Sequence, residues 1–278
     1  AVRYRQKGAS GYFGGPMYYM EKGVGSKVLA IIFSCLCIAA SLGVGNMTQS
    51  NAISLATNQL WSFPYWLSGL LTALAIGLVI IGGIRRIALV TEWMIPFLSI
   101  GYLTCSILVL ILRADRLPEA IHLIFSSAFT PASAAGGVAG YTVSQAMRFG
   151  FARGIFSNEA GLGTLAVLHG PAEHTTPWEQ GMWAMFEVFF DTVVLCSLTA
   201  LVILCTTQGD TETLSLTGAA LAAACFSAKL GVIGEWFISI SMVVFAFATV
   251  IAWYYLGQQA IEDLSLFSRI YPVLFLGA

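Results

Sequence analysis

The chain has 278 residues, of which 58% are hydrophobic and 10% are charged, and its mean hydropathy is +0.81. Soluble proteins carry about 25% charged residues, so this composition excludes a water-soluble globule and predicts an integral membrane protein. Thirteen basic and 14 acidic residues give a formal net charge of −1 at pH 7, so no basic excess suggests a nucleic-acid partner.

The cysteines argue against two kinds of site. None is spaced as Cys-x-x-Cys and all lie inside or beside apolar runs, which disfavours a disulfide framework and a zinc site. We interpret them as small hydrophobic residues of membrane helices. They are Cys35, Cys37, Cys105, Cys196, Cys205 and Cys225.

The apolar runs are long enough to cross a bilayer, for which a helix needs about 20 residues. We predict six membrane segments in a single transmembrane domain, at residues 27–60, 64–84, 89–112, 117–154, 177–205 and 230–261. The start of another segment lies at residue 270. Because basic residues stand at the N-terminus without a preceding helix and the last run is short, we expect the chain to begin and end inside a longer protein.

Basic residues predict the orientation of these segments, because the cytoplasmic ends of membrane helices attract Lys and Arg. If the N-terminal flank is cytoplasmic, ten basic residues lie inside and three outside. The inner ones are Arg3, Arg5, Lys7, Lys22, Lys27, Arg85, Arg86, Arg148, Arg153 and Arg269, and the outer ones are Arg113, Arg116 and Lys229. The acidic sequence GDTET at residues 209–213 suits the outer face.

The segment at 27–60 contains GVGNMTQSNAISLA, which sets Asn46, Gln49 and Asn51 among apolar residues. Asn46 and Gln49 share a helix face because they are three residues apart. A side-chain amide offers two donors and an acceptor, so this pair can hold a zwitterion without burying a charge of its own. The alternative is a hydrogen bond between helices.

The segment at 117–154 has Pro131, Gly136, Gly137 and Gly140 where a continuous helix would have leucine or isoleucine. We therefore expect a broken helix. Unwound backbone at membrane depth occurs where it lines a cavity, and its free N–H and C=O groups can bind carboxylates and cations. The alternative is close helix packing through small residues.

The segment at 177–205 carries two acids, Glu187 and Asp191, one turn apart near its middle. Two carboxylates on one face repel, so at least one should be protonated or paired, and ionisable groups at this depth point to function. Arg148, Arg153, a coupling proton or a cation could be the partner. The alternative is a structural hydrogen bond to backbone or serine.

The segment at 230–261 has a stripe at helical spacing, formed by Met242, Ala246, Thr249, Trp253 and Gly257. The Thr249 hydroxyl could complete an oxygen shell for a monovalent cation. Trp253, one turn further, could form an apolar wall that limits the size of a bound side chain. The alternative is a packing stripe with Trp253 in the interfacial aromatic belt.

Four motifs resemble the alanine or glycine:cation symporter family, whose members include sodium:alanine symporters and D-alanine/glycine permeases. They are FARGIFSNEAGLGT (151–164), GYFGGPMYYMEKG (11–23), GVGNMTQSNAISLA (43–56) and FAFATVIAWYYLG (245–257). The resemblance covers nearly the whole chain in family order. It implies an all-helical, multi-pass membrane protein with part of a LeuT-type fold, which has five-plus-five inverted repeats. The first core helices would be missing from this chain.

The resemblance also implies which residues form each site. For substrate, with Asn46, these are Gln49, Gly136, Gly137, Gly140, Thr249 and Trp253. For the cation, they are the Ala246 carbonyl and the Thr249 hydroxyl. The SNEAGLG sequence is expected to shape an inner gate through Asn158, Glu159, Gly161 and Gly163.

The function implied is symport of a small neutral amino acid, alanine or glycine, by alternating access. Sodium is the expected coupling ion and no other cofactor is expected. The lipid environment would be the plasma or inner membrane of a bacterium. An enzyme is not expected, because Glu187 and Asp191 lack a nucleophile motif. The histidines His122, His169 and His174 also lack metal-ligand spacing.

Two alternatives remain open at this point. The chain could be an inactive fragment or one half of a split transporter, with the missing N-terminal helices on a separate chain. It could also be proton-coupled, because Glu187 stands where the family usually has an uncharged residue. A further departure is Gln258 and Gln259, where the family usually has an acidic and a basic residue after its W-x-Y-Y-G motif.

Overall fold

Helices make up most of the chain that the structure describes. The computed structural model describes residues 1–8, 11–129, 144, 147–148, 150, 159, 161–207, 216, 218–264 and 270–278. Helices long and apolar enough to cross a membrane are, in this part of the chain, Lys27–Trp61, Thr91–Leu112, Pro177–Thr207 and Ala220–Asp263. The prediction of a multi-pass helical membrane protein is therefore confirmed at this level of detail.

The first span joins two α-helices through a π-helical turn. α2 (Lys27–Ala40) begins after Ser26, whose hydroxyl caps the helix end. The π-helical turn η2 (Ser41–Met47) follows, and α3 (Thr48–Trp61) completes the span. π-helical turns are rare and frequently mark functional sites. The sequence predicted the span but not this turn.

The next two helices run back and forth beside the first span. α4 (Tyr65–Ile80) starts after a proline, and α5 (Gly83–Leu112) is a 30-residue helix. The hydroxyl oxygens of Thr57 and Ser68 lie 2.7 Å apart and join α3 to α4. The contact helps to hold the two helices together at the turn between them.

α6 (Leu117–Phe129) lies at the start of the fourth predicted segment. Its predicted break, carried by Pro131 and by Gly136, Gly137 and Gly140, lies outside the described residues. The break therefore stays a prediction.

The third long span again contains a π-helical turn. α9 (Pro177–Phe189) starts with a capping box, in which Thr176 and Glu179 each accept a hydrogen bond from the other's backbone N–H. It continues into the π-helical turn η4 (Phe190–Cys196) and then into α10 (Ser197–Thr207). Asp191 lies in η4, so one of the two predicted acids sits where the helix is locally widened.

The last long span, α12 (Gly218–Asp263), is kinked at Gly231, which has φ 62° and ψ −152°. Glycine alone adopts these dihedral angles readily. The predicted segment at 230–261 thus corresponds to the helix after the kink. The helix before it, residues 218–230, was not predicted, because it is shorter than the roughly 20 residues that signal a span.

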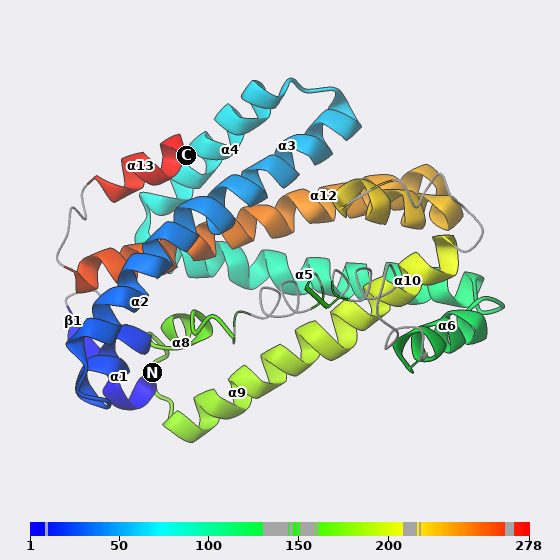
Figure 1. Cartoon of the computed structure of the whole chain (residues 1–278). Coiled ribbons are helices and arrows are strands. Elements are labelled where there is room, and N and C mark those ends of the chain that lie inside the picture. Colours follow the sequence, from blue (N-terminus) through cyan, green and yellow to red (C-terminus); the bar gives the residue numbers. More distant parts are fainter. Residues whose placement is uncertain are drawn as a thin grey trace.

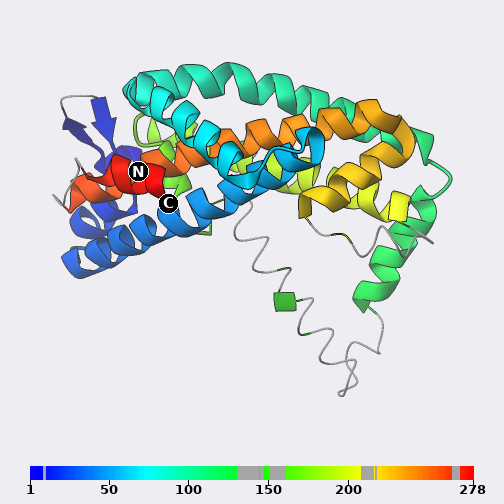
Figure 2. The same cartoon turned by 90° about the horizontal axis from the view of Figure 1, so that it is seen from above.

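Short elements cover one end of the helix bundle, as Figure 2 shows. After a single 3-10 turn (Val2–Tyr4), β1 (Gln6–Gly8) and β2 (Gly11–Phe13) form an antiparallel hairpin. α1 (Pro16–Lys22) follows the hairpin. The hairpin is an addition to the predicted all-helical architecture, because three-residue strands leave no alternating pattern to detect.

α12 is the central helix of the structure (Figure 1). It packs against α2, α3, α4, α5 and α10, and also against α8 (Leu165–Leu168) and α13 (Tyr271–Gly277). One buried cluster joins Met17, Val167 and Trp253, and therefore connects α1, α8 and α12. This cluster and a second one, which contains Val250 and Tyr254, lie around the half of α12 that carries the predicted site stripe, and a third, with Phe226 and Ile238, lies around the other half.

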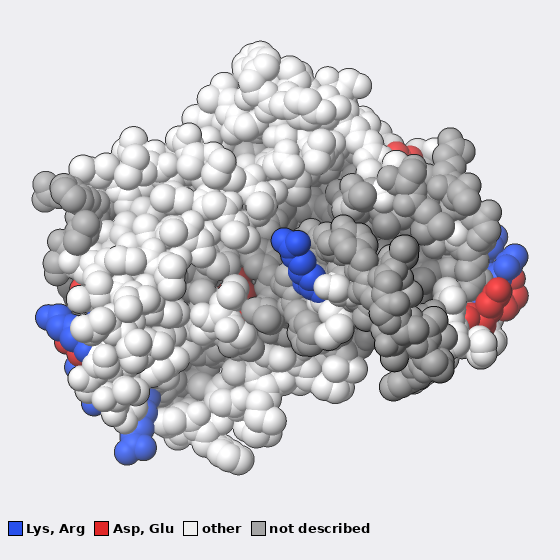
Figure 3. Space-filling view, in the orientation of Figure 1, with Lys and Arg blue, Asp and Glu red and all other residues white. Residues whose placement is uncertain are grey.

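Charged side chains are rare on the face drawn in Figure 3 and gather mostly at its two ends. Large apolar side chains are instead exposed, among them Trp66, Trp93 and Ile233. A soluble protein rarely exposes so much contiguous apolar surface, whereas a lipid-facing surface requires it.

Candidate functional site

The π-helical turn η2 lies against Trp253 of α12. A Cβ atom added at Gly45 would come within 2.3 Å of the Trp253 Cγ atom, so a side chain at position 45 would collide with the indole. Trp253 is only 1% exposed. The lack of a side chain at Gly45 therefore lets the indole ring pack on the backbone of the first span.

The Trp253 indole carries a polar group without a partner. Its Nε1 atom is buried and has no hydrogen bond within the described part of the chain. A buried tryptophan N–H usually finds an acceptor. The site therefore presents an unused donor in a buried position, and a carboxylate or carbonyl oxygen is the kind of group that it can bind.

Asn46 lies in the same π-helical turn and is 5% exposed. Its Nδ2 atom donates to the Phe275 carbonyl of α13 at 2.5 Å. Its Oδ1 atom accepts from the Ser50 hydroxyl at 3.2 Å. Both ends of the amide are thus engaged within the chain, which favours the alternative of a hydrogen bond between helices over a substrate contact.

Gln49 and Thr249 come from the neighbouring helices α3 and α12, and both are half-buried. Within the described residues, the Gln49 amide has no hydrogen-bond partner. The Thr249 hydroxyl donates to the Phe245 carbonyl of its own helix at 2.9 Å, so its oxygen can still bind a cation. Ala246, one turn before, is buried.

The stripe on α12 ends at Gly257, which lies under Tyr271 of α13. The Tyr271 and Ser41 hydroxyl oxygens are 3.0 Å apart. A Cβ atom at Gly257 would be 1.9 Å from the Tyr271 hydroxyl oxygen. This end of the stripe is therefore a packing contact between η2, α12 and α13.

Glu187 of α9 contacts a histidine that the sequence did not suggest. Its Oε2 atom lies 3.2 Å from the Nε2 atom of His169, the residue after α8. Of the two arginines considered as partners, Arg148 makes no ion pair with Glu187 in the described residues, and Arg153 lies outside them. Asp191 is half-buried and also has an interaction partner.

His169 could have been found from only one weak signal in the sequence. Gly170 and Pro171 follow it and predict a turn, which can bring a short helix back toward the next span. The pairing partner is 18 residues further along the chain. No helical or strand period relates positions at that separation.

The predicted gate loop packs against the start of the chain. Glu159 and Gly163 have positive φ angles of 54° and 78°, and Gly161 is exposed. A Cβ atom at Gly163 would lie 3.2 Å from the Cγ atom of Pro16 in α1. Asn158 lies outside the described residues.

The Glu159 carboxyl group is partly withdrawn from solvent. Its Oε2 atom accepts a hydrogen bond from the buried Thr164 hydroxyl at 3.1 Å. Burial raises the pKa of Glu159, the Thr164 hydrogen bond opposes this shift, and the charge of Glu187 adds to it. The charge on Glu187 of α9 therefore acts on the carboxyl group of Glu159 in this loop.

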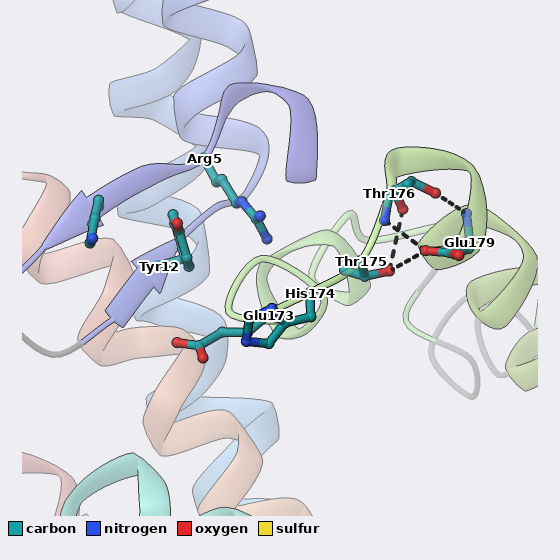
Figure 4. A pocket seen from close by; sticks show the side chains of 8 residues that line it. Arg5, Tyr12, Glu173, His174, Thr175, Thr176 and Glu179 are labelled. Atoms are coloured by element: carbon teal, nitrogen blue, oxygen red, sulfur yellow. Dashed lines mark hydrogen bonds between the residues drawn. The ribbon is translucent and has the colours of Figure 1, made fainter.

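Two surface pockets lie near the start of α9. One, of about 600 Å³, lies between the hairpin and the start of α9, where Figure 4 shows Arg5, Tyr12 and Glu179. The other, of about 350 Å³, is lined by residues that include His169 and Gln180. Neither contains Gln49, Thr249 or Trp253. In the described residues, no group of three or more His, Cys, Asp or Glu side chains could hold a metal ion.

Comparison with known proteins gives consistent matches. A family model described as "Sodium:alanine symporter family" matches residues 1–276. An uncharacterized transporter of Haemophilus influenzae is 37% identical, over 93% of this chain and 57% of its own length. The sodium/alanine symporter AgcS of Methanococcus maripaludis is 34% identical, over 99% of this chain and 61% of its own length.

A third relative is described with another substrate. The probable sodium/glutamine symporter GlnT of Bacillus subtilis is 35% identical, over 99% of this chain and 56% of its own length. The chain therefore spans between half and two-thirds of the length of these three relatives.

Proposed function

The chain belongs to the sodium:alanine symporter family, whose members are multi-pass membrane transporters and not enzymes, and we propose that it serves sodium-driven uptake of alanine or glycine. Membership alone leaves the amino acid open, because one relative is described with alanine and another with glutamine. The contact between Gly45 and Trp253 supports a small substrate, since the indole fills space beside the first span.

The proposed architecture is part of a LeuT-type fold without its first core helices. The six predicted segments would correspond, in order, to core helices three to eight. The order of the spans along the chain and their packing around α12 support this assignment. Rocking of one group of helices against another would expose the site alternately to the two sides of the membrane.

The observation that carries the proposal is the buried N–H of Trp253, which has no hydrogen-bond partner among the described residues. A donor left unsatisfied in a buried position costs about 1–3 kcal/mol, and a substrate carboxylate would remove that cost. Gln49 would add the donors and acceptor of its amide from α3. The unwound backbone predicted at Gly136, Gly137 and Gly140 would complete the site.

The coupling ion would lie one turn away from Trp253. The hydroxyl of Thr249 and the carbonyl of Ala246 would supply two of its oxygen ligands. One monovalent cation moving down a potential of 100 mV releases about 2.3 kcal/mol. Because each 1.4 kcal/mol corresponds to a tenfold concentration ratio, this energy alone supports a substrate concentration inside that is tens of times higher than outside.

Uptake of labelled alanine by the full-length gene product in proteoliposomes tests the proposal. We expect uptake only when a sodium gradient points inward. Trp253→Phe keeps an aromatic ring but removes the N–H, and it should raise KM about tenfold, because a hydrogen bond to a charged group is worth roughly 1.5–3 kcal/mol. Alanine uptake that is indifferent to sodium would overturn the coupling, and an unchanged KM would overturn the role of the indole.

A further inference from the structure

His169 lies between two residues of one face of α9. Its Nδ1 atom is 2.5 Å from Gln180 Oε1, and its Nε2 atom is 3.2 Å from Glu187 Oε2. Gln180 and Glu187 are seven residues apart, which is about two helical turns, so they lie on the same face. The imidazole ring therefore bridges the end of α8 to two successive turns of a membrane span.

Hydrogen bonds at the start of α9 determine which nitrogen of His169 carries a proton. The Glu179 carboxylate accepts from the Thr176 backbone N–H at 2.8 Å. The Thr175 hydroxyl donates either to this carboxylate, at 3.3 Å, or to the Thr176 carbonyl, at 3.4 Å. Figure 4 shows these three residues. In both cases the only proton of the hydroxyl points away from Gln180.

The Thr175 oxygen is then free to accept, and Gln180 Nε2 donates to it at 3.3 Å. In this orientation of the Gln180 amide, Gln180 Oε1 faces the imidazole. A carbonyl oxygen only accepts, and Nδ1 of His169 must therefore carry a hydrogen.

A neutral imidazole with its hydrogen on Nδ1 presents a lone pair at Nε2. An ionised Glu187 also presents only lone pairs, and two acceptors at 3.2 Å repel each other. The contact is favourable only when one more proton is present, either on His169 or on Glu187. We infer that His169 and Glu187 form a binding site for one proton and that transport depends on its occupancy, an inference that rests on the proposed function.

The position of Glu187 favours a shared proton. It lies ten residues into the span that begins at Pro177, or about 15 Å along the helix axis, and its side chain is 57% exposed. An unpaired carboxylate exposed within a membrane span is unfavourable. The hydrogen bond to Glu187 raises the pKa of His169, burial opposes this shift, and the Gln180 contact adds to it.

Other charged groups surround the pair. The charge of Glu187 acts on Glu159 of the gate loop, and Asp191 lies one turn beyond Glu187 along the same span. On the opposite side, Arg3 lines the same pocket of about 350 Å³ as His169. The acidic groups favour binding of the proton, and the guanidinium group of Arg3 opposes it.

The proton would act on transport through α8. Val167 of α8 is fully buried in the cluster that also contains Trp253. With the proton bound, His169 holds α8 against α9. Loss of the proton leaves two acceptors facing each other, and α8 is released together with its contact to the Trp253 cluster. We expect uptake to fall as the pH rises through the pKa of the pair.

The test uses Glu187→Gln, whose amide can donate to Nε2 at any pH, in the full-length gene product. Wild-type uptake should fall about fivefold as the pH rises from mildly acidic to alkaline values, because the pKa of His169 is raised. Uptake by Glu187→Gln should stay nearly constant, and His169→Gln should also lose the pH dependence. His122→Gln changes an exposed histidine of α6 and should keep the wild-type profile.

A measurement that does not need transport separates this site from the proposed function. A group whose pKa is raised in the folded state stabilises below its unfolded pKa, and that stability is lost as the pH passes the folded pKa. The Tm of wild-type protein should therefore fall relative to Glu187→Gln as the pH rises. If Glu187→Gln and His169→Gln keep the wild-type pH profiles of Tm and uptake, the proposed proton site is wrong. If their uptake still depends on sodium, the symport proposal is not affected by that result.

Discussion

At the scale of single residues, the contact between Gly45 and Trp253 combines two properties that a small-substrate site needs. The indole can approach the first span only because position 45 has no side chain. The same packing buries the indole N–H and leaves it without an acceptor in the described residues. The close packing beside the first span and the N–H without an acceptor in the described residues therefore both come from the contact between Gly45 and Trp253.

Replacement of Gly45 by alanine should disturb this contact. The added methyl group would meet the Trp253 side chain at 2.3–2.6 Å, and overpacking of this kind costs about 1–3 kcal/mol. We expect a lower Tm of the purified protein and a loss of alanine uptake.

Gly43→Ala is the matched control, because it lies in the same π-helical turn and a Cβ atom there meets nothing within 4 Å. Its Tm should stay the same or rise slightly, since alanine is the better helix former. Equal Tm losses in the two variants would show that the turn, and not the contact with Trp253, is sensitive.

Some residues of the proposed site follow a pattern in the sequence, whereas the contacts of others do not. The stripe through Thr249 and Trp253 follows the helical period, so its common face was predictable. The partner of Asn46 is a backbone carbonyl 229 residues away, at Phe275, and no local pattern encodes it. The pair of His169 and Glu187 likewise depends on how the chain turns after α8.

At the scale of helices, the apolar runs of the sequence do not reveal the irregularities within the spans. Apolar runs determine where a helix crosses the membrane, and α5, α9 and α10 lie close to the predicted segments. The π-helical turns η2 and η4 do not alter the hydropathy of the sequence, so they cannot be predicted from its apolar pattern. Both contain a polar residue singled out from the sequence, Asn46 and Asp191.

The kink in α12 leads to a prediction about Gly231. Gly231 has φ 62° and ψ −152°, and a residue with a Cβ atom would be strained there. Gly231→Ala should lower the free energy of unfolding by about 1 kcal/mol or more, because the native backbone conformation is incompatible with alanine.

Gly181→Ala provides the comparison for Gly231→Ala. Gly181 lies within α9, and a Cβ atom there meets nothing within 4 Å. Alanine should stabilise that position by up to about 1 kcal/mol. Denaturant unfolding of both variants in detergent would measure the difference, and an unchanged Gly231→Ala protein would argue against the kink.

At the scale of the whole molecule, the arrangement is compatible with the orientation predicted from basic residues. The hairpin, α1 and the C-terminal end of α12 gather at one end in Figure 1, and α6 and the kinked start of α12 lie at the other. The first end carries Arg3, Arg5 and Lys22, predicted inside. The second carries Arg116 and Lys229, predicted outside.

The proposed symport mechanism also has a consequence for the molecule as a whole. If sodium and the amino acid bind next to each other, each should raise the affinity for the other by the same factor. The short distance along α12 between Thr249 and Trp253, one helical turn, makes such coupling direct. No conformational relay between distant sites is required.

Equilibrium binding of labelled alanine to the purified full-length protein, with and without sodium, tests this central claim most directly. We predict that sodium lowers the Kd for alanine at least about tenfold, which corresponds to a coupling free energy of about 1.4 kcal/mol. Thr249→Ala should remove most of this effect. A Kd for alanine that is the same in sodium and in choline would contradict the account.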